Sequence, residues 1–529
     1  MVYLKRLAIA LAVVVLALAA LAIPGPAFDP NTEAAPATPA RVVGAVAPAE
    51  GSKGSASTNS ASSTSSTAAR TGSAPFRWDN DALWQRLEER FVAAKESGCA
   101  ARELEIGNGR ARIGELLDDL GTSGSSPADR RWDGIEATLF EFAPLVAACP
   151  DGAAGYIEAF ARIRSTLKGH SVQWDPNDRV VKERLYRMLY GGRAAVEEVL
   201  LQMDADEAAE LVLMRGFDEP SESPTLEING VSVHSGDILV SRGGYPTSAL
   251  IARGSDFPGN FSHVGLVQIN KNDQPSIIEA HIDHGLSVAT VPKYFSDRKM
   301  RVMLLRPRRD LPGIEENPLA PHIAASRALA RAQNGHVPYD FEMDYTDPSE
   351  LFCSEVASSA YDEFDITLWA GLSTISAPGL KRWLASFGVR HFETQEPSDL
   401  EYDPQLVVVA EWRNPVALYR DHVDNAVVDA MLEGAEAGDR LDYPFMMLPF
   451  ARVAKGYSVL LNELSRVGPV PEGMSATAAL RSRAYSRRHA ELARAVLRDA
   501  AAFQDSTDYR APYWKLVEFA RAAVQAERS

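Results

Sequence analysis

The hydrophobic pattern changes its period twice along this 529-residue chain, and these changes limit the folds that it can adopt. Between residues 76 and 224, apolar side chains such as Leu83 and Leu87 recur at helical spacing, which is typical of amphipathic helices. From about residue 225, short apolar runs alternate with Gly, Asn, Asp and Pro, a pattern typical of strands and turns. The helical period returns after residue 413. We therefore expect an α+β fold, with a mostly antiparallel sheet between two helical regions.

The first 27 residues have the parts of an export signal. Lys5 and Arg6 form a positive region, an unbroken apolar run extends from Leu7 to Ile23, and Pro24 and Pro26 follow it. The run is long for a signal peptide and short for a membrane-spanning helix, so residues 1–27 fit either a cleaved signal peptide or a retained anchor. In both cases we expect the remainder to be exported, as a periplasmic protein or one tethered through residues 7–23 and facing the periplasm.

Composition sets the remaining boundaries and excludes some partners. Residues 28–75 are rich in Ala, Ser, Thr, Gly and Pro and predict a disordered linker. We then expect a helical domain at 76–224, a mixed domain at 225–413 and a helical region at 414–529, in which the sequence indicates no chemistry. The formal net charge of −17 argues against a nucleic-acid partner. It also disfavours binding to anionic lipid through a basic patch.

Three cysteines occur in the chain, at positions 99, 149 and 353. In an oxidising compartment, an odd number suggests one disulfide and one free thiol. Cys99 and Cys149 both lie in the N-terminal helical region, so they could bridge two helices. The alternative is that both are buried thiols. If they are bridged, Cys353 is the free thiol.

Cys353 stands at the start of an apolar helical run, and Asp347 and Glu350 before it resemble the start of a helix. A thiol in the first turn of a helix faces unpaired amides that favour the thiolate, lower the thiol pKa and can hold an oxyanion. If Asp347 caps the helix, Cys353 lies nearly two turns in, and only a break after Glu350 restores this effect. The alternative is a buried cysteine on a core helix.

His263 opens a strand-like run and shares one face of it with Val267, because side chains alternate along a strand. Glu279 ends the next apolar run, where an acid on an adjacent strand could accept the second ring N–H of His263. An imidazole that meets a thiol forms a base and a nucleophile. The alternatives are a structural histidine and a solvated carboxylate at a sheet edge.

Glu279, His281, Asp283 and His284 form a compact group that could also be interpreted as metal ligands. The two neighbouring histidines lie in a predicted turn, and no further histidine or cysteine stands at zinc-like spacing. We therefore expect no metal and no other cofactor.

Five short motifs occur in an order that resembles the permuted NlpC-type, papain-like cysteine hydrolases of the YiiX/YebB-like group. In chain order they are Ser235–Leu239, Ser262–Gly265, Ile277–Ala280, Pro338–Phe341 and Phe352–Glu355. The resemblance implies a permuted papain-like fold over about 225–413, with the histidine strand before the cysteine helix. It implies Cys353 as nucleophile, His263 as base and Glu279 as the orienting residue. It also implies that Tyr339 lines the substrate cleft.

The sequence departs from the minimal family domain in its two flanking helical regions and in the tract Asp256–Asn260, which we expect to reshape the cleft entrance. The predicted function is that of an exported cysteine hydrolase that cleaves an amide bond, in cell-wall peptides, through an acyl-enzyme. Two alternatives stay open. One is a lipid acyl hydrolase or acyltransferase on the same fold, and the other is an inactive scaffold tethered to the membrane.

Overall fold

The structure is a computed structural model that describes residues 74–78, 80–122, 124–462 and 466–528. The predicted leader at 1–27 and almost all of the predicted linker at 28–75 lie outside the described residues. Within the described ranges, no helix combines the length and the apolar character that crossing a bilayer requires.

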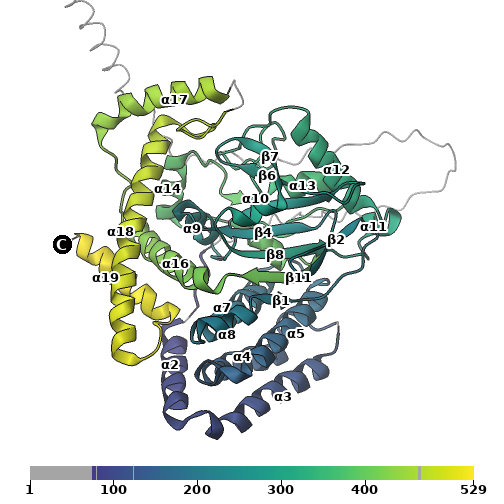
Figure 1. Ribbon diagram of the computed structural model, residues 1–529, viewed down its shortest axis with the longest axis vertical. Helices are drawn as coiled ribbons and strands as arrows, with labels where there is room; N and C mark the ends of the chain where they lie inside the picture. Colours follow the sequence, from purple (N-terminus) through teal and green to yellow (C-terminus); the bar gives the residue numbers. More distant parts are fainter. Residues whose placement is uncertain (1–73, 79, 123, 463–465, 529) are drawn as a thin grey trace, which may run out of the picture.

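A seven-stranded sheet forms the centre of the molecule (Figure 1), and every pair of neighbouring strands in it is antiparallel. Its spatial order is β1-β11-β8-β4-β5-β6-β7. The bounds are β1 Leu213–Arg215, β4 Ile238–Gly243, β5 His263–Ile269, β6 Pro275–His281, β7 Gly285–Thr290, β8 Lys299–Pro307 and β11 Leu406–Arg413. Two small pairs accompany the sheet: β2 Thr225–Ile228 with β3 Val231–His234, and β9 Ser373–Thr374 with β10 Glu393–Thr394. The expected α+β class is confirmed.

Both faces of the sheet are covered because strand side chains alternate between them. On one face, Val264 and Leu266 of β5 pack with the helices α12 and α13. On the other face, Val267 packs in a cluster with Tyr294 of α10 and with the β2–β3 hairpin. The helices of this part of the chain are α9 Pro246–Arg253, α10 Val291–Ser296, α11 Pro312–Glu316, α12 Ala320–Gln333, α13 Glu355–Asp362, α14 Pro378–Phe387 and α15 Asp399–Tyr402.

The N-terminal helices pack beneath the β1–β11 edge, with α5 in contact with both strands (Figure 1). Their bounds are α2 Asn80–Ser97, α3 Glu103–Leu120, α4 Arg130–Ala148, α5 Ala153–Ser171, α6 Arg179–Leu185, α7 Gly192–Leu201 and α8 Ala205–Glu210. Two 3-10 helices, η1 Cys99–Ala101 and η2 Pro150–Gly152, and one π-helix, η3 Tyr186–Gly191, lie between them. A disulfide between Cys99 and Cys149, with Cα atoms 5.4 Å apart, links η1 to the residue that follows α4.

The C-terminal helices form a third layer at the side of the sheet (Figure 1). They are α16 Pro415–Glu436, η4 Phe445–Met447, α17 Leu448–Asn462, α18 Ala476–Thr507 and α19 Tyr513–Arg528. Helices α16, α18 and α19 share one apolar core with α9 and α14. This shared core attaches the C-terminal region to the mixed domain.

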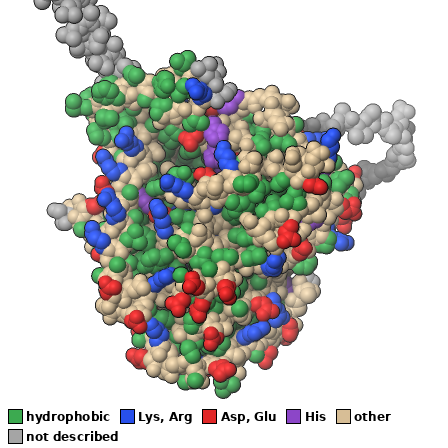
Figure 2. All heavy atoms as spheres, in the orientation of Figure 1, with side chains coloured by type: hydrophobic (Ala, Val, Ile, Leu, Met, Phe, Trp, Pro, Cys, Tyr) green, Lys and Arg blue, Asp and Glu red, His purple; other side chains and the backbone are tan. Residues whose placement is uncertain are grey.

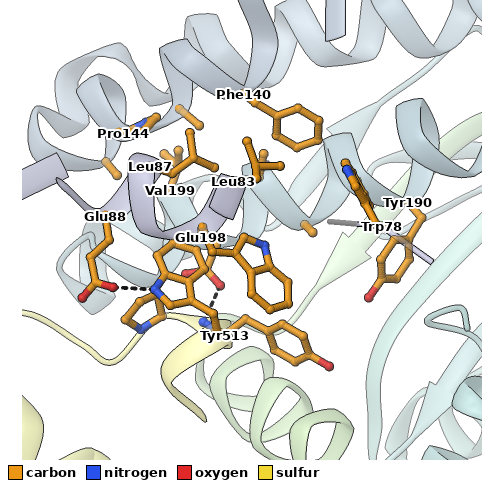
Figure 3. A pocket seen from close by; sticks show the side chains of 18 of the residues that line it. Trp78, Leu83, Leu87, Glu88, Phe140, Pro144, Tyr190, Glu198, Val199 and Tyr513 are labelled. Atoms are coloured by element: carbon orange, nitrogen blue, oxygen red, sulfur yellow. Dashed lines mark hydrogen bonds between the residues drawn. The ribbon is translucent and has the colours of Figure 1, made fainter. Parts of the chain in front are cut away.

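An aromatic cavity of about 210 Å³ lies where the N-terminal and C-terminal helices meet (Figure 3). Trp84 of α2 stacks on Trp514 of α19 with ring centroids 5.9 Å apart. The Trp514 indole N–H donates to Glu88, and the Tyr513 backbone N–H donates to Glu198. These contacts join the two ends of the described chain.

Two neighbouring groups of buried ion pairs, which we together call the ion network, connect all three parts of the fold. The first group consists of Arg164 on α5, Arg193 on α7, Glu401 on α15, and Glu411 and Arg413 on β11. The second consists of Glu197 on α7, Arg242 on β4, Arg301 on β8, and Asp421 and His422 on α16. Two arginines each bridge two carboxylates: Arg193 pairs with Glu401 and Glu411, and Arg301 pairs with Glu197 and Asp421. Because these groups are buried, each depends on its partners for the solvation it has lost.

Candidate active site

Strand register brings His263 and Glu279 together. Gly265 pairs with Glu279 across β5 and β6, so His263, two residues earlier, lies on the same face as Glu279. The His263 Nε2 atom lies 2.7 Å from Glu279 Oε2, a hydrogen bond that holds the ring. This bond occupies one ring nitrogen and leaves Nδ1 as the atom that can accept a proton.

Cys353 lies directly before a helix. Helix α13 begins at Glu355 with Ser354 as its N-cap residue, and Asp347 accepts from the backbone N–H of Ser349 in a separate local turn. The turn at Asp347 is therefore separate from α13. Cys353 lies next to the start of this helix and not two turns into it, which is the arrangement that lets helix amides act on the thiol. The backbone amides of Val264 and Ser354 both favour the thiolate of Cys353.

The expected lowering of the thiol pKa is nevertheless wrong. Burial raises the pKa of Cys353 to about 12, and the amides of Val264 and Ser354 only oppose this rise. Burial also lowers the pKa of His263 to about 4, with the Lys299 ammonium adding to the effect and Glu279 opposing it. Desolvation disfavours the charged form of both groups. Near neutral pH the resting pair is therefore a thiol and a neutral imidazole.

Glu279 is the charged member of the group. Burial by itself would raise the pKa of Glu279, but hydrogen bonds to His263 and His281 hold it well below its usual range. The carboxylate is thus ionised and positioned to stabilise a positive charge that forms on the His263 ring.

Cys353, His263 and Tyr339 line one cleft of about 390 Å³. Glu279 lies behind His263 and is not among the residues that line it. Tyr339 stands in an extended segment in which Leu351 donates to Pro338 and Asp340 donates to Leu351 through backbone hydrogen bonds. This pairing fixes Tyr339 close in space to the residues before Cys353.

Sequence reasoning missed Lys299, which lines the same cleft with its side chain only 5% exposed. Burial lowers the pKa of Lys299, while Glu279 and Asp297 oppose the shift. Its Nζ atom lies 4.3 Å from the centre of the Tyr294 ring. The position of Lys299, a charged residue at the start of an apolar strand, was a signal that it could have a role. The sequence does not show, however, that β8 begins beside the cleft.

Sequence reasoning also missed the C-terminal wall of the cleft. Four of its residues come from the region in which no chemistry was expected: Pro471, Met474, Ser482 and Ser486. The tract Asp256–Asn260, by contrast, does not line the cleft. The Asp256 carbonyl accepts from Phe76, and the Phe257 ring stacks on the Phe76 ring. The prediction that this tract reshapes the cleft entrance is therefore wrong.

The structure groups two of the four possible metal ligands, Glu279 and His281, with His263 and places the other two outside this group. His263, Glu279 and His281 each offer one atom, and these atoms all lie within 4.8 Å of one another. His284 instead stacks on His281, with ring centroids 5.1 Å apart, and Asp283 lines the cleft. Two imidazoles and a carboxylate suit zinc and similar ions. A metal bound there would compete with the proposed base for the same His263 ring.

Comparison with known proteins finds a family that the mixed domain is similar to. Residues 232–410 match the model of the permuted papain-like amidase enzymes, YaeF/YiiX, C92 family. The predicted resemblance is confirmed. All of Cys353, His263, Glu279 and Tyr339 lie within the matched residues, whereas α16 to α19 lie outside them.

One solved structure also matches, that of the metalloprotein YiiX from Escherichia coli O157:H7. It is 17% identical, covers 33% of this chain and 95% of that chain, and has a TM-score of 0.26. The comparison with curated proteins gives no match.

Proposed function

We propose that this chain is an exported thiol amidase that cleaves amide bonds of cell-wall peptides through an acyl-enzyme on Cys353. The observation that carries the proposal is the meeting of three elements. Cys353 precedes the N-terminus of α13, it shares a cleft with His263, and Glu279 holds the far nitrogen of that ring. The match of residues 232–410 to an amidase family supports the reaction class.

The neutral resting pair dictates how the reaction starts. As the cysteine sulfur attacks the carbonyl carbon, its proton passes to His263, so charge forms only when substrate is present. Glu279 stabilises the imidazolium that results. The backbone amides of Val264 and Ser354 are the groups next to the sulfur that can hold the oxyanion.

Two bond cleavages complete the cycle. The C–N bond breaks, and the imidazolium of His263 gives its proton to the leaving amine. Water then loses a proton to His263 and attacks the thioester carbonyl. The C–S bond breaks, Cys353 regains its proton, and the carboxylic acid product leaves.

The decisive experiment compares the wild-type chain with Cys353→Ala on muropeptides and on acyl-lipids, with products followed by mass spectrometry. We expect new peptide fragments from the wild type only. Cleavage of acyl-lipid alone would replace the amidase with the lipid hydrolase. Cleavage of neither substrate would favour the inactive scaffold.

Alkylation without substrate tests the resting state. Because the pKa of Cys353 is raised to about 12, we expect iodoacetamide to react with it at pH 7 about 10³-fold more slowly than with free cysteine. The rate should climb with pH throughout the range from 6 to 9. A rate that is flat across this range would reveal a preformed thiolate–imidazolium pair and contradict the neutral resting state.

A metal-dependent hydrolase is a second candidate, favoured by the grouping of His263, Glu279 and His281. The two candidates make opposite predictions for one pair of variants. A metal enzyme would keep its activity in Cys353→Ala and lose it in His281→Ala or with a chelator. The thiol amidase loses its activity in Cys353→Ala and is unaffected by the chelator.

A further inference from the structure

Helix α17 carries its large apolar side chains on the outside. Met446, Phe450, Val453, Tyr457 and Leu460 follow one another at intervals of three and four residues, which places them on one face of the helix and its preceding turn. Their exposed fractions are 80%, 67%, 61%, 54% and 59%. We call these five residues the α17 stripe. Figure 2 shows hydrophobic atoms gathered over α17 at the top of the molecule.

The opposite face of α17 does the packing within the molecule. Leu448, Ala451 and Ser458 are its buried residues, so two of the three are small. A helix normally turns its larger apolar side chains toward the core, and α17 does the reverse. A contiguous apolar surface of this kind marks a contact with another molecule or with a membrane.

The stretch of sequence that contains the stripe is basic, although the whole chain is acidic. From Arg440 to Arg488 the sequence holds eight Lys and Arg and three Asp and Glu, a local excess of five positive charges against −17 overall. Arg466, Arg483 and Arg487 are exposed among them. The whole-chain charge, which disfavoured a basic patch for anionic lipid, averages over this local excess. Apolar side chains beside basic ones are typical of helices that lie in a membrane interface.

The stripe is fixed next to the catalytic cleft. Lys455 of α17 donates from Nζ to the Pro471 carbonyl at 3.1 Å, and Pro471 lines the cleft. Ser458 accepts from the backbone N–H of Val470 at 2.9 Å. Glu472, which follows Pro471, accepts a hydrogen bond from His336 at 2.7 Å. Helix α17 is thus tied to the cleft wall and to the segment that follows α12.

We propose that the α17 stripe docks on the surface of a lipid bilayer with anionic headgroups, which sets the cleft of Cys353 at that surface. The apolar side chains enter the boundary between headgroups and acyl chains, and exposed arginines of the same stretch, such as Arg466, contact the lipid phosphates. A tether at residues 7–23 would keep the protein near the membrane in any orientation. The stripe selects one orientation, with the cleft beside the bilayer. The docking does not depend on catalysis by Cys353.

The test uses the full chain with Cys353→Ala, so that one added cysteine carries a polarity-sensitive fluorophore. The probe is placed at Leu460→Cys in one sample and at Leu104→Cys in the other. Leu104 is a matched control because it is 76% exposed on α3, at the opposite end of the molecule from α17 (Figure 1). Both proteins are reconstituted in phosphatidylcholine vesicles with and without phosphatidylglycerol.

We expect a blue shift and a several-fold rise in emission for the probe at 460 in the vesicles that contain phosphatidylglycerol, and no change for the probe at 104. The double substitution Phe450→Glu and Tyr457→Glu should abolish the response at 460. Both side chains are exposed, so folding should persist, and circular dichroism checks it. Equal responses at 460 and 104 would overturn the proposal. So would a response in pure phosphatidylcholine that grows with protein density, since that would reveal contact between two copies.

Discussion

The ion network and the active site are both buried groups of titratable side chains, yet their electrostatics differ. In the network, the guanidinium groups of Arg413, Arg193 and Arg164 lower the pKa of Glu411 to about 2, although burial alone would raise it. In the active site, burial dominates and leaves Cys353 and His263 neutral. The network thus has charges that are compensated at rest. In the site, Glu279 is ionised at rest, whereas the charges on Cys353 and His263 form only during the reaction.

This difference separates a structural role from a chemical one. Removing one charge from a compensated network leaves its partners buried and unpaired, which costs stability. Removing a neutral group from the site leaves no charge stranded, so the loss falls on the reaction instead. The predictions below test this separation, beginning with the largest effect.

Cys353→Ala should lower turnover of the cleaved substrate by about 10⁴-fold or more, since no other group supplies the nucleophile. Its unfolding free energy should stay within about 1 kcal/mol of the wild type, because the removed thiol is small and uncharged. Steady-state kinetics and urea unfolding measure the two quantities. Retained turnover would assign the chemistry to another group in the cleft.

Glu411→Gln should destabilise the protein by about 3–5 kcal/mol, because three arginines lose their shared carboxylate in a buried place. Glu433→Gln is the matched control. It removes the same charge from an exposed ion pair with Arg521, in which the Glu433 side chain is 52% exposed, and should cost at most about 1 kcal/mol. Equal losses in the two variants, measured by urea unfolding, would remove the distinction drawn for the network.

Glu279→Gln should lower turnover about 10²-fold, equivalent to about 2.7 kcal/mol in the barrier, because the amide cannot stabilise the His263 imidazolium by charge. Glu227→Gln on β2, where the side chain is exposed, should leave turnover unchanged. Glu279 acts through His263, so the pH–rate profile should shift with the substitution. A fall in turnover without any shift in that profile would indicate a purely structural role.

The pH dependence of stability should have opposite signs in the two regions. Burial alone would lower the pKa of His422, but hydrogen bonds to Glu197 and Glu198 raise it to about 9. The contribution of His422 to the free energy of unfolding is therefore complete below about pH 6.5 and is lost as the pH rises through 9. The pKa of His263 is lowered to about 4 in the folded protein. As the pH drops from about 6.5 to 4, His263 of the unfolded chain takes up a proton that His263 of the folded chain does not. The free energy of unfolding therefore falls over this range.

Two variants separate these contributions. His422→Gln should flatten the alkaline side of the stability curve, and His263→Gln should reduce the slope on the acidic side. Each effect is at most about 3 kcal/mol. Urea unfolding across pH 4 to 10 measures both. A loss of alkaline dependence in His263→Gln would contradict the assignment of the two sides.

The candidate site could be proposed from the sequence because its residues lie in short motifs within strands and next to a helix, and the structure brings them together. Side-chain alternation placed His263 and Val267 on one face, as found in the sheet. The pKa of Cys353 could not be predicted in the same way. The helix start is local in the sequence, whereas the burial that raises the pKa arises from segments far from Cys353 in the chain.

The sequence by itself determined the α+β class and the order of the histidine strand and the cysteine helix, and it selected Cys353, His263 and Glu279 as the candidate site residues. Each of these follows from local period, local spacing or a local motif. Only the tertiary structure decided that Lys299 and the C-terminal helices border the cleft, that ten charged residues share a buried network, and that α17 faces outward. The physical reason is the same for all three. Burial and exposure depend on which distant segments pack together, and the hydrophobic period of a helix does not say which of its faces will find a partner.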